Sequence, residues 1–141
     1  MQRLVVLHVE KNKEEISLLA RACEAANLPI DLHGISDAPK AIEYLTGAGS
    51  FADRKQHPQP DLVILDLELP GMGGIELLKW LRSRSDLQKL PVLVFTRSQR
   101  VEDKTLVMEN GANGYFTKPS DFASLVRVAE SLRKFHRSND E

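Results

Sequence analysis

Four residues with charged or hydroxyl side chains follow short apolar runs, and their types suit the transfer of a phosphoryl group. Glu10 follows LVVLHV, Asp66 lies near the end of DLVILDL, Thr96 follows PVLVF, and Lys118 follows GYFT. The Asp66 carboxylate could act as a nucleophile and form an acyl phosphate, with Lys118 balancing the charge and the Thr96 hydroxyl binding a phosphoryl oxygen. A buried salt bridge without chemistry is the alternative interpretation, because a buried carboxylate needs a partner in any case.

The elements that position these residues alternate along the chain. Five apolar runs without strict polar alternation are typical of strands covered on both faces; they span 4–9, 30–35, 61–67, 91–95 and 114–117. Five amphipathic segments follow them and span 13–26, 37–46, 74–82, 100–109 and 121–135. Asn12, with Glu15 three residues on, is the expected N-cap of the first helix. The alternation predicts a parallel sheet with helices on both faces, and ligands of such sheets bind beyond the carboxyl ends of the strands.

Composition and charge limit the class of protein. The chain has 141 residues, 42% hydrophobic and 28% charged, and a formal net charge of −1. These values are those of a globular domain and provide no basic surface for nucleic acid or membranes. The single cysteine, Cys23, cannot form a disulfide within the chain, which fits a reducing compartment. We expect a cytoplasmic protein with one domain over 1–141, a core over about 3–136, and no output domain.

Four stretches resemble the response-regulator receiver domain of two-component signalling. They are VLHVEKN, PDLVILDLELPGMGG, PVLVFTRS and GANGYFTKP, and the resemblance extends from residue 3 to about 136. It implies a flavodoxin-like (βα)5 fold with the strand order 2-1-3-4-5. The loop GAGSFADRKQHPQP and the tail LVRVAESLRKFH are similar to the small stand-alone regulators that pair with phytochrome-type kinases.

The resemblance also implies a role for each matching residue. Asp66 would accept the phosphoryl group from a sensor histidine kinase, Lys118 would contact it, and Thr96 would move to hydrogen-bond it. Tyr115 matches the aromatic residue that swings inward with that hydroxyl, and Pro119 matches a proline that often follows a cis peptide bond. The surface of the fourth helix, fifth strand and fifth helix would then change its affinity for a partner or a second copy. Such a protein is a switch and not an enzyme, beyond hydrolysis of its own acyl phosphate.

Two residues depart from the family pattern. The resemblance places Mg²⁺ on Glu10, Asp66 and the backbone carbonyl of Glu68, but Lys11 replaces the usual second acid. We hypothesise that the Lys11 ammonium points inward and stands in for the metal, which would weaken Mg²⁺ binding. The opposite pose, with the side chain in solvent, would leave a weak metal site. Arg97, directly after Thr96, could restrict access to the phosphoryl group.

Two other functions compete with the phosphorylation switch. The first is a pseudo-receiver that acts as an interaction module without phosphorylation, with Lys11 replacing the metal. The second is a phosphatase with an aspartyl nucleophile, of the haloacid dehalogenase type. That class places an Asp two residues after the nucleophile, and here the residue is Glu68.

Overall fold

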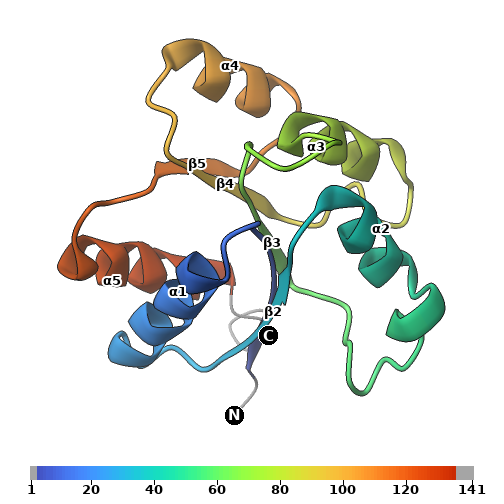
Figure 1. The fold of residues 1–141 in the computed structure, drawn as a ribbon, viewed down its shortest axis with the longest axis horizontal. Coiled ribbons are helices and arrows are strands. Elements are labelled where there is room, and N and C mark those ends of the chain that lie inside the picture. Colours follow the sequence, from blue (N-terminus) through green and yellow to red (C-terminus); the bar gives the residue numbers. More distant parts are fainter. Residues whose placement is uncertain (1–2, 136–141) are drawn as a thin grey trace.

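A computed structural model describes residues 3–135 of the chain, and Figure 1 shows their arrangement. The strands are β1 (Leu4–Val9), β2 (Ile30–Ile35), β3 (Leu62–Leu65), β4 (Val92–Thr96) and β5 (Gly114–Thr117). The helices are α1 (Lys13–Ala25), α2 (Ala38–Thr46), α3 (Gly74–Ser83), α4 (Val101–Glu109) and α5 (Phe122–Ser131), with 3₁₀ turns η1 (Gly49–Phe51) and η2 (Leu132–Phe135). Residue 136, the expected end of the core, and the tail beyond it lie outside the described residues.

The five strands form one parallel sheet in the order β2-β1-β3-β4-β5, which confirms the predicted topology. Helices α1 and α5 cover one face, and α2, α3 and α4 cover the other (Figure 1). Two predicted elements are shorter than expected. The strand predicted over 61–67 ends at Leu65, and the helix predicted over 121–135 continues after Ser131 as the 3₁₀ turn η2.

The alternation of side chains along the central strands divides the core into two layers. Leu7 and Val9 of β1 face the α2–α4 side, whereas Leu4 and Val6 face the α1–α5 side. Strand β3 is buried along its whole length, as a central parallel strand must be. Its apolar residues therefore fix the strand ends on which the candidate site is built.

Asparagine and aspartate side chains begin three of the helices. The Asn12 side chain accepts hydrogen bonds from the backbone N–H groups of Glu14 and Glu15, as predicted. Asp37 and Asp121 cap α2 and α5 in the same way. In a capping box at α1, the Glu15 carboxylate would accept a hydrogen bond from the Asn12 backbone N–H. Instead, the Glu15 carboxylate pairs with Arg97 and Lys118.

Helix α4 is largely exposed. Only Val107 is buried among its residues, and Val101, Leu106 and Met108 are 75%, 39% and 43% exposed. No helix within residues 3–135 is both long and apolar enough to cross a membrane.

Candidate functional site

The strand register brings the predicted residues to one edge of the sheet. Val9 of β1 is aligned with Leu65 of β3, and Leu65 with Val94 of β4. The residues that follow these positions therefore meet beyond the carboxyl ends of the strands. Glu10, Asp66 and Thr96 are 1%, 3% and 0% exposed, so this edge holds two carboxylates and a hydroxyl away from bulk water.

The Lys118 ammonium lies at the centre of the site. Its Nζ atom lies 2.7 Å from Glu10 Oε1, 3.0 Å from Asp66 Oδ2 and 2.5 Å from Glu15 Oε1. Burial by itself would lower the pKa of Lys118, but the hydrogen bonds to Glu10, Glu15 and Asp66 outweigh it and raise the pKa. The lysine is therefore held in its charged form.

The remaining oxygens of the two buried carboxylates bind backbone N–H groups. Asn12 donates to Glu10 Oε2 at 3.1 Å, and Glu68 donates to Asp66 Oδ1 at 3.2 Å. Burial raises the pKa of Glu10, against the opposing effect of the hydrogen bonds from Lys118 and Asn12. The pKa is raised at both residues, which favours the charged form of Lys118 and disfavours the charged form of Glu10, because at Glu10 burial outweighs the hydrogen bonds.

The arrangement does not fit a divalent cation as it stands. No group of three or more histidine, cysteine, aspartate or glutamate residues within 3–135 is placed to hold a metal. Glu10 and Asp66 are brought together, and the Lys118 ammonium contacts both of them. The predicted carbonyl ligand belongs to Glu68, whose side chain is exposed.

The hypothesis that Lys11 stands in for the metal is wrong. Its side chain is exposed, and it forms no ion pair with any residue of the described segment 3–135. The long stem of a lysine lets the ammonium reach water, which costs less than burial beside Lys118. Lys118 is the cation that contacts both Glu10 and Asp66.

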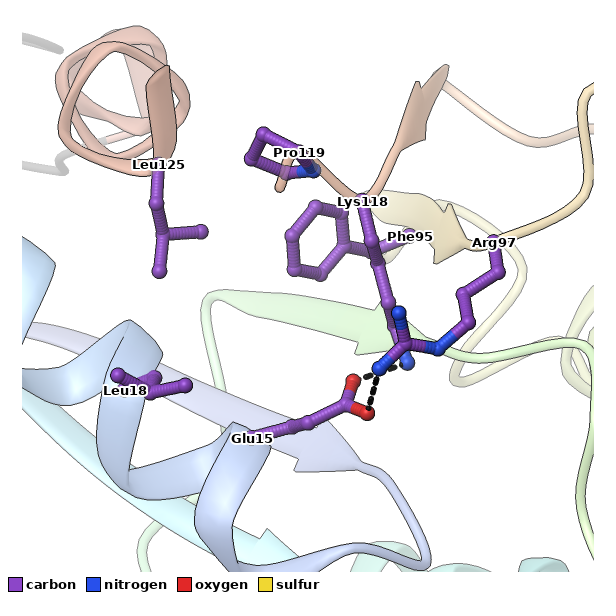
Figure 2. A pocket seen from close by; sticks show the side chains of 7 residues that line it. All are labelled: Glu15, Leu18, Phe95, Arg97, Lys118, Pro119 and Leu125. Atoms are coloured by element: carbon purple, nitrogen blue, oxygen red, sulfur yellow. Dashed lines mark hydrogen bonds and ion pairs between the residues drawn. The ribbon is translucent and has the colours of Figure 1, made fainter. Parts of the chain in front are cut away.

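Glu15 is a site residue that sequence reasoning missed. It was assigned to the start of α1, yet its carboxylate bridges Lys118 and Arg97, with Oε2 lying 2.6 Å from Arg97 Nη2 (Figure 2). Burial would raise the pKa of Glu15, but hydrogen bonds from Lys118 and Arg97 lower it. The carboxylates of Glu10, Asp66 and Glu15, with the cations of Lys118 and Arg97, give this ionic group a net charge of −1.

Arg97 reaches across the site instead of extending freely into solvent. Its guanidinium crosses from the end of β4 to α1 and pairs with Glu15 (Figure 2). The side chain is 66% exposed, so the ion pair lies at the mouth of the site and not inside it. Two features of the sequence could have predicted this ion pair: Arg97 directly follows Thr96, and its charge is opposite to that of Glu15.

Tyr115 connects β5 to the loop before α4. Its hydroxyl donates a hydrogen bond to the Ser98 carbonyl at 2.7 Å, and its ring is half-buried. Ser98 also donates from its backbone N–H to Thr96 Oγ1, at a long 3.4 Å. The predicted switch residues Thr96 and Tyr115 are therefore joined through one loop residue.

Two backbone features surround the site. No peptide bond in the described chain is cis, so the bond between Lys118 and Pro119 is trans, contrary to the expectation; trans is the intrinsically preferred form. Gly74, the first residue of α3, has no space for a side chain, because a Cβ atom would collide with the Asp66 carbonyl oxygen and Leu67 Cα. This glycine lets α3 begin directly against the end of β3.

His8 is a buried neighbour of the ionic group. It is 1% exposed, lies two residues before Glu10 on β1, and its Nδ1 atom finds no hydrogen-bond partner among the described residues. Burial, followed by the charge of Lys118, lowers its pKa to about 4. His8 is therefore neutral near pH 7.

Comparisons with known proteins agree with this geometry. Rcp1 of Synechocystis is 28% identical over 93% of this chain and 87% of its own length, and the Mn²⁺-bound form of Rcp1 has a TM-score of 0.80. The phosphorylated cyanobacterial phytochrome response regulator RcpA is 28% identical, with a TM-score of 0.85 over 98% of this chain and 96% of that chain. RPA3017, a response regulator in red light signalling of R. palustris, is 30% identical, with a TM-score of 0.87 over 94% of this chain and 92% of that chain.

The family model of the response regulator receiver domain matches residues 6–130. This range includes every strand end that forms the ionic group, from Glu10 to Lys118. The chain therefore belongs to the response regulator receiver domain family of two-component signalling.

Proposed function

We propose that residues 3–136 act as one receiver domain in which Asp66 accepts a phosphoryl group from the phosphohistidine of a sensor histidine kinase. The observation that carries the proposal is the buried Asp66 carboxylate, 3.0 Å from the Lys118 ammonium and one strand away from the Thr96 hydroxyl. A buried salt bridge alone would not need the hydroxyl or the link from Thr96 through Ser98 to Tyr115.

In the proposed transfer, an Asp66 carboxylate oxygen attacks the phosphorus atom. The phosphorus–nitrogen bond breaks, its electron pair remains on the imidazole of the kinase, and an acyl phosphate forms on Asp66. Lys118 stabilises the negative charge on the phosphoryl oxygens, and Thr96 donates a hydrogen bond to one of them.

The output of the switch follows from the Tyr115 contact. A Thr96 hydroxyl that moves toward a phosphoryl group pulls on the loop that also binds Tyr115, and this loop leads into α4. Because α4 buries only Val107, its exposed apolar side chains can change position at little cost. We propose that α4, β5 and α5 form the binding surface, and that a second copy of this chain is the first occupant to test.

The proposed kinase is of the phytochrome type. Among the similar structures, RcpA is described as a phytochrome response regulator and RPA3017 as part of red light signalling. Both likenesses extend over more than nine-tenths of this chain. The pseudo-receiver alternative loses its main argument, because the Lys11 side chain points to solvent.

The test is phosphorylation by acetyl phosphate, with and without Mg²⁺, followed by intact mass. We expect wild-type protein to gain one phosphoryl group and Asp66→Asn to gain none. Asp86→Asn is the matched control, because it makes the same change at an exposed acid that pairs with Arg84. A wild-type protein that gains no mass from acetyl phosphate or from a phytochrome-type kinase would contradict the proposal.

A further inference from the structure

The Glu15 carboxylate binds two cations at the mouth of the site. Its Oε1 atom lies 2.5 Å from Lys118 Nζ, and its Oε2 atom lies 2.6 Å from Arg97 Nη2. An ammonium and a guanidinium that share one oxyanion form an arrangement well suited to a phosphoryl group as well. Glu15 thus fills a two-cation site that could bind another anion.

Lys118 has no hydrogen-bond donor left for a further anion. A lysine ammonium has three N–H donors, and those of Lys118 are matched by the three carboxylates of Glu10, Glu15 and Asp66. When Asp66 becomes an acyl phosphate, its own hydrogen bond to Lys118 can pass to a phosphoryl oxygen. A second phosphoryl oxygen can bind Lys118 only if Glu10 or Glu15 gives way.

Burial decides which of these two carboxylates gives way. Glu10 is 1% exposed and is also held by the Asn12 N–H. The Glu15 side chain is 18% exposed, and its second partner, Arg97, is mostly in solvent. Glu15 is therefore the carboxylate whose release costs least, because water can solvate it as it leaves.

We propose that Glu15 is an internal competitor, which occupies Lys118 and Arg97 in the resting protein and is displaced by the phosphoryl group on Asp66. Arg97 then becomes a second cation for the phosphoryl group. The inference rests on the proposed function, since it supposes that a phosphoryl group arrives at Asp66.

An anion from solvent can reach the two cations. Glu15, Arg97 and Lys118 line an open pocket, whose other wall is formed by apolar side chains that include Leu18, Phe95 and Leu125 (Figure 2). The displaced Glu15 side chain would turn toward the same opening. This access lets a free anion report on the site without any transfer to Asp66.

The test is the binding of inorganic phosphate to unphosphorylated protein, followed by NMR shifts of the backbone amides of Glu15, Arg97 and Lys118 at constant ionic strength. We expect Glu15→Gln to bind phosphate about tenfold more tightly than wild type, because one charge-assisted hydrogen bond to Lys118 no longer competes. Glu14→Gln is the matched control: it removes the same charge one residue earlier, at an exposed position. Adding Arg97→Gln to Glu15→Gln should weaken the binding again.

The outcome is separable from that of the proposed function. Equal phosphate affinity in Glu15→Gln, Glu14→Gln and wild type would overturn the competitor role, even if acetyl phosphate modifies Asp66. A gain in Glu15→Gln that Arg97→Gln removes would support it, even if Asp66 is never modified. A gain that survives Arg97→Gln would overturn the part assigned to Arg97.

Discussion

The hydroxyl of Tyr115 donates a hydrogen bond of 2.7 Å to the carbonyl of Ser98, and this bond ties β5 to the loop that leads into α4. The loop also contains the backbone N–H that approaches Thr96. A change at the buried strand end therefore has a direct route to the exposed helix. The route consists of one side chain and one loop residue, so single substitutions can interrupt it.

Tyr115→Phe should loosen this loop. Loss of one hydrogen bond costs about 1 kcal/mol of unfolding free energy, and the backbone amides of Ser98 and Arg100 should exchange hydrogen faster. Urea unfolding and hydrogen exchange measure the two effects. Tyr44→Phe is the matched control, since the Tyr44 hydroxyl donates to Pro58 at 2.8 Å in a different part of the fold. Faster exchange near Ser98 in both variants would contradict the local link.

Lys118→Met should destabilise the protein strongly near pH 7. The substitution leaves Glu10 and Asp66 buried without their cation, at a cost of about 3 kcal/mol or more. Burial already raises the pKa of Glu10, and loss of the Lys118 hydrogen bond would raise it further, so part of the stability should be regained as the pH falls and Glu10 is protonated. Urea unfolding at pH 7 and pH 5 gives both quantities. Lys11→Met, at an exposed lysine, should change stability by less than about 0.5 kcal/mol.

His8 predicts a second dependence of stability on pH. Its folded pKa of about 4 lies below the ordinary value of 6.5, so between these pH values the unfolded chain takes up a proton that the folded protein does not. Stability should therefore fall as the pH decreases through this window, by up to about 3 kcal/mol from this residue. His8→Leu should have a shallower pH dependence of urea unfolding between pH 7 and pH 4.5. Parallel curves for the two proteins would show that His8 does not contribute.

Lys11→Asp should increase the affinity for Mg²⁺. The change returns an acid to the position after Glu10, and one charge interaction at 4 Å is worth about 4 kcal/mol at an effective dielectric constant of 20. An increase of tenfold or more is expected, because solvent screening at this exposed position reduces the full value. Mg²⁺ titration followed by Trp80 fluorescence or by calorimetry measures it. Lys13→Asp, the same reversal two residues on, should have a much smaller effect, and equal effects would point to net charge alone.

The pattern of the sequence predicted a parallel sheet covered by helices and the types of residue at its strand ends, whereas the strand order came from the resemblance to receiver domains. Its apolar runs and amphipathic segments recur in a fixed order, and a parallel β-α alternation leaves few ways to connect them. Asp66, Thr96 and Lys118 were predictable for the same reason, because the end of a strand fixes the place of the residue that follows it. Asn12 was predictable as a cap because the requirement is local.

Only the tertiary structure decided which charges meet. Lys11 is next to Glu10 in sequence, but its side chain is exposed to solvent. Lys118 follows β5 and Glu15 lies on α1, yet the two side chains pair beside Asp66. A lysine or glutamate side chain is long and flexible, so its partner depends on the space and charge around its tip rather than on its position in the chain. Strand register is set by the backbone and is visible in the pattern of residues, but ion pairing is set by side-chain reach and burial.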